Sequence, residues 1–200
     1  MTTIAENLHH VQTRIVQACT EAGRAGDAVL LLAVSKTFGA DAVAQAHAAG
    51  QTAFGENYIQ EGVEKIQALR HLPLQWHCIG PIQSNKTRLV AEHFDWVHTI
   101  DRVKIAQRLS EQRPEHLAPL QVCIQVNVDG GANKSGVSAS EARDLAQAVA
   151  ALPHLRLRGM MCIPEPAPDF VAACALYARA RAVFDSLNTV QMPLDTLSMR

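Results

Sequence analysis

Short apolar runs recur along the chain, and most of them are continuous rather than alternating with polar residues. A continuous run is typical of a strand that is covered on both faces, and hence of a parallel sheet. The pattern predicts seven such strands: Val29–Ser35, Thr52–Gly55, Trp76–Ile79, Trp96–Ile100, Val122–Val128, Leu157–Ile163 and Thr196–Met199.

Between these runs, apolar residues recur at three- and four-residue spacing, which predicts amphipathic helices. Thr3 with Glu6 forms a capping-box pattern for the first helix, and Asp41–Gly50 begins with a capping residue and ends in glycine. An alternation of strands and helices gives either a doubly wound sheet or a (β/α)8 barrel. No GxGxxG pattern follows the first strand, which disfavours a dinucleotide-binding fold. We expect a single (β/α) barrel domain over residues 1–200.

Composition narrows the class of protein. The 200 residues are 48% hydrophobic and 18% charged, with a formal net charge of −1, as in a folded globular chain. No Lys/Arg-rich run is present, so nucleic acid is not an expected partner. The apolar runs are shorter than a membrane span, and the N-terminus does not resemble a signal peptide. Five cysteines without a CxxC pair and histidines without HExxH indicate reduced thiols, no metal site and a cytoplasmic location.

Polar residues gather where the predicted strands end. In a barrel, the carboxyl ends of the strands form the face that holds the active site. Strand ends also meet solvent, so each such residue alone is weak evidence for a site. They are Lys36, Glu56, Asn57, Gln83, Asn85, Lys86, Asp101, Asn127 and Asp129.

Lys36 directly follows the first predicted strand and lies between the small hydroxyl residues Ser35 and Thr37. It could be a surface lysine whose ammonium reaches water. It could also be an amine held at the barrel mouth to form an imine with an aldehyde, a reaction that needs the unprotonated form. The residues alone leave both interpretations open.

A set of motifs in fixed order favours the second interpretation. "LLAVSKT", "FGENYIQE", "WHCIGPIQSNK", "VHTID", "QVNVDGGANKSG", "RGMMCIP" and "LDTLSM" together resemble the YggS/PROSC family of pyridoxal 5′-phosphate (PLP) homeostasis proteins. The resemblance covers nearly the whole chain. It implies an α/β fold of the TIM-type (β/α)8 barrel class, alanine racemase-like, called fold type III among PLP proteins.

The resemblance also implies roles for individual residues. Lys36 would hold the cofactor as a Schiff base, with Asn57 near the ring. Ser198 and Met199 match the start of a segment that cradles the phosphate. Lys134 matches a family lysine linked to a secondary vitamer site, although a solvated loop cation is the interpretation we favour there.

The chain departs from the family pattern after "LSM", where Arg200 replaces a glycine. The family continues with a helix, a "GST" loop and a final strand. The eighth strand is therefore expected to be absent from residues 1–200, and with it most of the phosphate cup. Two explanations stay open: a piece of a longer protein, which we favour, or a chain that retains the cofactor weakly.

The resemblance implies a PLP-binding protein of intracellular vitamin B6 homeostasis, without robust catalysis of its own. The alternative is a PLP-dependent, racemase-like enzyme. Racemisation needs an acid/base group on each face of the imine, and neither Tyr58 nor Tyr177 is a convincing second base. A cofactor-free interaction module is a further alternative. Expected partners are related vitamers and apo-enzymes that use PLP, and the single domain suggests a monomer.

Overall fold

The computed structural model describes residues 2–130 and 135–199. Contacts within the chain divide it into two compact units, Met1–His77 and Cys78–Arg200, and each is described here by itself. In both units strands alternate with helices, as the apolar runs predict. Within the described ranges, no helix is both long enough and apolar enough to cross a bilayer. The prediction of one domain over residues 1–200 stays a prediction.

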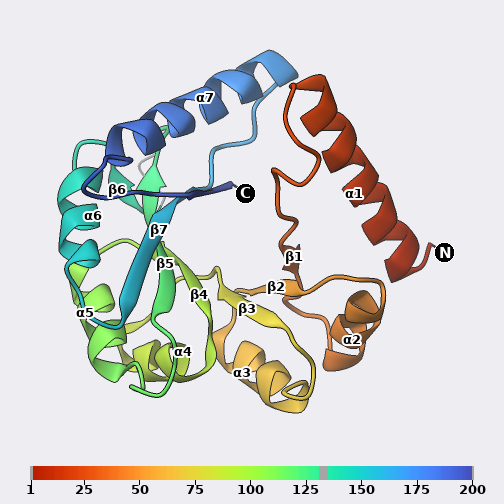
Figure 1. Cartoon of the computed structure of the whole chain (residues 1–200), viewed down its shortest axis with the longest axis horizontal. Coiled ribbons are helices and arrows are strands. Elements are labelled where there is room, and N and C mark those ends of the chain that lie inside the picture. Colours follow the sequence, from red (N-terminus) through yellow and green to blue (C-terminus); the bar gives the residue numbers. More distant parts are fainter. Residues whose placement is uncertain (1, 131–134, 200) are drawn as a thin grey trace. The chain divides into compact units, whose positions relative to one another are not determined.

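The first unit begins with a helix whose start the sequence predicts. The Glu6 N–H donates to Thr3 Oγ1 at 3.2 Å, and the Thr3 N–H donates to Glu6 Oε2 at 2.7 Å, which confirms the capping box. Strands β1 and β2 pair in parallel, α3 packs on β2, and α1 contacts α2 (Figure 1). The elements are α1 (Ile4–Glu21), β1 (Ala33–Val34), α2 (Ala40–Ala48), β2 (Ala53–Glu56) and α3 (Ile59–Ala68), followed by β3 (Gln75–Cys78), which crosses the unit boundary.

Strand β1 is shorter than the apolar run predicts. The run begins at Val29, but regular strand geometry covers only Ala33 and Val34. The side chain of Gln51 donates to the Leu31 carbonyl at 2.8 Å, so an amide group replaces a ladder contact there. The expected boundary at residue 29 is therefore wrong: Val29 and Leu30 are exposed, and a side chain rather than a neighbouring strand bonds the Leu31 carbonyl.

The second unit carries a parallel set of strands. β4 pairs with β5, β5 with β7, and β7 with β8, while the short β6 pairs with β5. All residues of β4 are buried, as expected for a strand covered on both faces. The elements are the 3₁₀ turn η1 (Ser84–Lys86), α4 (Thr87–His93), β4 (Trp96–Ile100), α5 (Val103–Gln112), β5 (Leu120–Asn127), β6 (Val137–Ser138), α6 (Ala142–Ala150), β7 (Leu155–Cys162), α7 (Phe170–Leu187) and β8 (Thr196–Met199).

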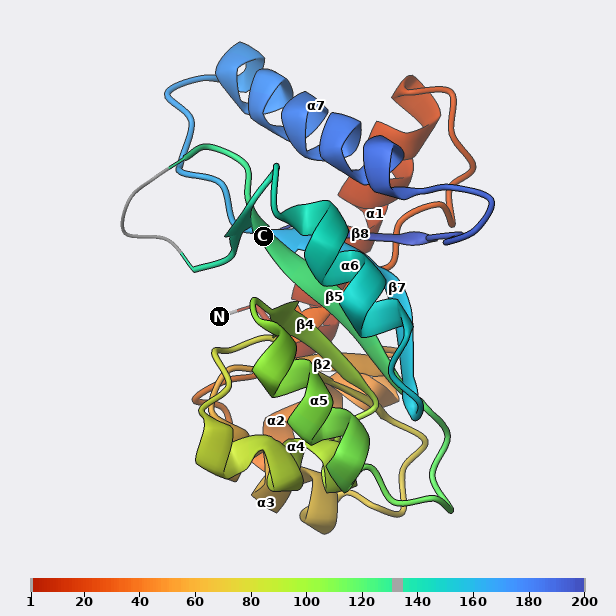
Figure 2. The ribbon, with the colours of Figure 1, turned by 90° about the vertical axis from the view of Figure 1, so that its left-hand side faces the viewer.

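Helices α5 and α6 cover one face of the second unit's strands. Figure 2 shows both helices in front of β4, β5 and β7, and they contact these strands. Each of the seven predicted strands has a counterpart among the observed ones, and β6 is the strand that the sequence did not predict.

Gly159 lets β8 lie against β7. It pairs with Thr196, and a Cβ atom at residue 159 would collide with the Thr196 carbonyl oxygen. It would also lie 3.2 Å from the Phe184 ring of α7. The close approach of two backbones thus requires a residue without a side chain at this point.

Candidate functional site

The carboxyl ends of β1 and β2 lie side by side in the first unit. The strands are parallel, and Val34 lies opposite Gly55. Lys36 lies two residues beyond Val34, and Asn57 lies two residues beyond Gly55. The structure therefore brings these two predicted cofactor-binding residues to the same edge of the strand pair.

Lys36 lies in a four-residue turn that follows β1. The Phe38 N–H donates to the Ser35 carbonyl at 3.1 Å, which makes Lys36 the second residue of the turn. Its side chain is half-buried. It makes no hydrogen bond or ion pair with any residue in 2–130 or 135–199. The Lys36 amine is therefore not hydrogen-bonded to any acceptor within that range.

Thr37 has an unfavourable backbone conformation. Its φ is 67°, at the third position of the turn. Positive φ at that position defines a type II turn, which glycine or asparagine normally occupies. For a β-branched residue the conformation costs about 1–3 kcal/mol and persists only where its surroundings hold it. The neighbours of Thr37 must therefore stabilise the turn.

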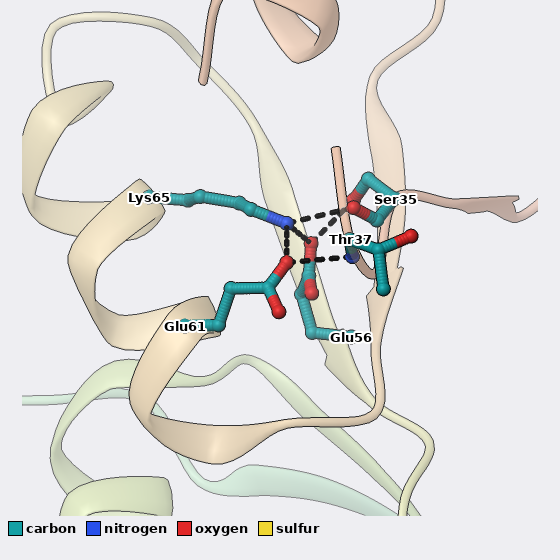
Figure 3. Close-up of polar contacts among 5 residues, drawn as sticks. All are labelled: Ser35, Thr37, Glu56, Glu61 and Lys65. Atoms are coloured by element: carbon teal, nitrogen blue, oxygen red, sulfur yellow. Dashed lines mark hydrogen bonds and ion pairs between the residues drawn. The ribbon is translucent and has the colours of Figure 1, made fainter. Parts of the chain in front are cut away.

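Three side chains supply that stabilisation, and we call Glu56, Glu61 and Lys65 the Lys65 clamp (Figure 3). Lys65 Nζ donates to Glu56 Oε1 at 2.7 Å and to Glu61 Oε1 at 2.6 Å. It also donates to the Ser35 carbonyl at 2.7 Å. The Thr37 N–H donates to the same Glu61 oxygen at 2.7 Å. The clamp thus contacts the turn on both sides of Lys36.

Two of the three clamp residues are buried, and the Lys65 ammonium is fully bonded, whereas Glu56 Oε2 has no hydrogen-bond partner among the described residues. Glu56 is 0% exposed and Lys65 is 5% exposed, and each of the three ammonium hydrogens of Lys65 has an acceptor. Removing one partner of such a buried pair typically costs about 3–5 kcal/mol, because a charge stays buried alone. The hydrogen bond from Lys65 lowers the pKa of Glu61 below its ordinary value, and the Thr37 N–H adds to this effect.

Asn57 presents an unused polar group beside Lys36. Its Oδ1 atom is buried and has no hydrogen-bond partner among the described residues. An unsatisfied buried acceptor costs about 1–3 kcal/mol. The amide can offer either its oxygen or its NH₂ group, because rotation exchanges the two. Asn57 is therefore ready to accept from or donate to a polar ligand.

An open hollow of about 430 Å³ borders the turn but does not include Lys36 or Asn57. The hollow is lined by the carboxyl groups of Glu61 and Glu64 and by the ammonium of Lys65, which already bonds acceptors within the clamp. It is therefore a poor place for a phosphate dianion. Its lining residues are Thr37, Phe38, Gly39, Ala40, Glu61, Glu64 and Lys65.

Ser198 and Met199, the other predicted cofactor-binding residues, end β8 in the second unit. Met199 pairs with Cys162 at the carboxyl end of β7. Ser198 Oγ and Nδ1 of the buried His98 share a hydrogen bond of 2.8 Å. Arg200 lies outside the described residues. The phosphate-cradling role of Ser198 and Met199 stays a prediction.

Two of the polar strand-end residues in the second unit accept hydrogen bonds from backbone N–H groups. Asn127 Oδ1 accepts from the Gly130 N–H at 3.0 Å, and Asp129 Oδ2 accepts from the Glu165 N–H at 2.7 Å. These contacts fix the loops that follow β5 and β7. Lys134, the predicted secondary-site lysine, lies outside the described residues.

The sequence did not identify Glu61 and Lys65 as site residues. They are four residues apart, which on a helix such as α3 is the spacing of an ion pair, and this spacing can be read from the sequence. A lysine within "EGVEKIQ" nevertheless resembles a solvated one, and its contact with Ser35 joins residues 30 positions apart. Tertiary placement of α3 creates that contact, and the local sequence does not encode it.

Comparisons with known proteins agree with this architecture. The alanine racemase N-terminal domain family matches residues 4–200. The pyridoxal phosphate homeostasis protein of Pseudomonas aeruginosa is 58% identical over 199 residues, which cover 100% of this chain and 85% of that protein. The protein of the same name from Escherichia coli K12 is 51% identical over 202 residues, covering 100% and 86%.

Solved structures show the same fold. PipY of Synechococcus elongatus PCC7942 with PLP bound has a TM-score of 0.85 and 34% identity, covering 98% of this chain and 88% of PipY. The alanine racemase of E. faecalis has a TM-score of 0.70 and 20% identity, covering 94% of this chain and 50% of the racemase. The racemase shows the fold alone. Together these findings confirm the predicted alanine racemase-like α/β barrel class. They show that the chain belongs to the alanine racemase N-terminal domain family, among the pyridoxal phosphate homeostasis proteins of the YggS/PROSC type.

Proposed function

We propose that this chain binds PLP on Lys36 and serves in intracellular vitamin B6 homeostasis. The observation that carries the proposal is the half-buried Lys36 amine, which no described residue engages, beside the unpaired amide oxygen of Asn57. The names of the relatives and the PLP-bound PipY structure support it.

The residues present suit this cofactor. When bound, PLP supplies an aldehyde carbon that an amine can attack. The Lys36 nitrogen would form the C=N bond of a Schiff base, and the aldehyde oxygen would leave as water. The Asn57 amide would hydrogen-bond a polar atom of the ring, and the Ser198 hydroxyl and the chain at Met199 would contact the phosphate.

The proposal also states that the chain stores and delivers the cofactor and does not catalyse a reaction with it. The recipients would be apo-enzymes that use PLP, and the chain would be a monomer located in the cytoplasm. None of the five cysteines forms a disulfide, and four of them are buried, which suits a reducing compartment. The alanine racemase of E. faecalis is matched over only half of its length, so the likeness supports no racemase activity here.

The direct test is intact mass after incubation with PLP and borohydride reduction. The wild-type chain should gain one reduced adduct, and peptide mapping should place it on Lys36. Lys36→Ala should lose the adduct and stay folded, while Lys104→Ala, an exposed lysine on α5, should keep it. An adduct retained by Lys36→Ala would refute the assignment.

A second measurement separates a carrier from an enzyme. The PLP-loaded wild-type chain is incubated with L-alanine in deuterium oxide, and exchange of the α-proton is followed by NMR. We expect no exchange above that of free PLP. Exchange that depends on Lys36 would favour the racemase-like alternative.

A further inference from the structure

Side chains from outside the turn hold both peptide groups that flank Lys36. In the peptide before it, the Ser35 carbonyl accepts from Lys65 Nζ at 2.7 Å. In the peptide after it, the Thr37 N–H donates to Glu61 Oε1 at 2.7 Å. Because Glu61 and Lys65 are four residues apart on α3, one face of one helix fixes both peptides (Figure 3).

A buried carboxyl group ties the turn to β2 as well. Glu56, the last residue of β2, accepts at Oε1 from Ser35 Oγ at 2.6 Å and from Lys65 Nζ at 2.7 Å. One oxygen atom thus joins the turn, the strand and α3. Glu56 Oε2 has no hydrogen-bond partner among the described residues, so the carboxyl group is held through Oε1 alone. Displacing the turn would still separate the buried Lys65 ammonium from its acceptors, which opposes movement of the turn.

The clamp also explains how Thr37 keeps its left-handed conformation. Glycine would adopt a φ of 67° freely, whereas threonine needs support from its surroundings. The hydrogen bond to Glu61 gives that support at the peptide next to Lys36. The backbone conformation of the turn determines the direction in which the Lys36 side chain leaves the backbone.

We propose that Glu61 and Lys65 are positioning residues, which orient the Lys36 amine for its reaction with the aldehyde without contacting that amine. The proposal rests on the proposed function, in which Lys36 is the residue that forms the Schiff base. A displacement of about 1 Å at a reacting group can slow a reaction by about 100-fold, so a rigid turn matters for the rate of adduct formation.

The test measures the rate of adduct formation with PLP, using borohydride quenching and intact mass. Glu61→Ala removes the bond to Thr37 but leaves Lys65 its other two acceptors, so the fold should survive. We expect a rate about 10- to 100-fold lower. The matched control is Glu64→Ala, an exposed glutamate on the same helix, whose rate should stay within about twofold of wild type.

Two rescue variants separate positioning from a merely structural role. Glu61→Gln keeps an acceptor for the Thr37 N–H and should restore most of the rate. Thr37→Gly, combined with Glu61→Ala, should also restore it, because glycine adopts the turn without support. Glycine adds no contact between α3 and β2, so it would not repair a general loss of packing.

Each outcome decides the proposal. An unchanged rate in Glu61→Ala, or a slow rate that neither rescue variant restores, would overturn it. If Glu61→Ala does not fold, Glu61→Asp replaces it, since this change keeps the charge but withdraws the carboxylate by one methylene group from the Thr37 N–H. An unchanged rate in Glu61→Asp would overturn the proposal, and a lower one would support it. A wild-type chain that forms no adduct on Lys36 refutes the proposed function itself, whereas a normal wild-type adduct with an unaffected Glu61→Ala refutes only the clamp.

Discussion

Lys36 and Lys65 carry the same ammonium group in the same unit, but their surroundings differ. Lys65 is 5% exposed and donates to two carboxylates and a backbone carbonyl, all within 2.7 Å. Lys36 is half-buried on a turn, and within the described ranges no acceptor bonds its side chain. All three ammonium hydrogens of Lys65 are used in hydrogen bonds within the protein. A ligand that binds the Lys36 amine, by contrast, need not displace a partner in the described part of the chain.

The difference shows that burial alone does not mark a reactive lysine. The more buried of the two amines is the structural one, because its acceptors compensate for its lost hydration. The candidate for the reaction with an aldehyde is Lys36, whose amine makes no hydrogen bond or ion pair with the described residues. Three measurements can break or sharpen this contrast.

The largest effect should come from making the same substitution at both lysines. Lys65→Met should lower the free energy of unfolding by about 3–5 kcal/mol, because the Glu56 carboxyl stays buried without its cation. Lys36→Met should change it by no more than about 0.5 kcal/mol. Urea unfolding followed by circular dichroism measures both, and equal losses would contradict the contrast.

A smaller effect is expected from a substitution at Asn57, which should raise the stability of the chain and weaken PLP binding. Asn57→Leu removes a buried amide oxygen that has no partner among the described residues, so the free energy of unfolding should rise by up to about 1 kcal/mol. Loss of the hydrogen bond to the ring should weaken PLP binding by about tenfold. Urea unfolding and PLP titration test the two halves. A loss of stability would show that the amide already has a structural role.

The smallest effect is a pH dependence that Glu61 contributes. Its pKa in the folded chain lies below the ordinary 4.5, chiefly because Lys65 donates to it. The resulting stabilisation is complete above the unfolded value and is lost as pH falls through the lower folded value. The difference in free energy of unfolding between wild type and Glu61→Gln should therefore shrink as pH falls below about 4.5. Urea unfolding across this range measures it, and a difference that is independent of pH would contradict the lowered pKa.

The sequence predicts two strands with the boundaries that the structure shows, Trp96–Ile100 and Thr196–Met199. The first is buried throughout, whereas the residues of the second are half-buried or exposed. The start at Val29 fails because an apolar run does not reveal that the Leu31 carbonyl bonds a side chain. The two-residue β6 is too short to leave a pattern in the sequence.

The candidate site is predictable only in part. Lys36 and Asn57 both follow predicted strands, and parallel pairing brings such residues together, but their cofactor-binding roles come from the family resemblance. Glu61 and Lys65 were missed because their role depends on how α3 packs against β2. The left-handed Thr37 was also unpredictable, since nothing in "VSKTFG" signals a turn that usually needs glycine.

Gly159 limits how this chain can vary. Because β7 and β8 approach so closely there, any side chain at this position would push away the strand that carries Ser198 and Met199. Substitutions can accumulate on the outer helices without moving that strand. A mutagenesis library aimed at altered vitamer preference should therefore keep codon 159 constant and diversify the strand ends around it.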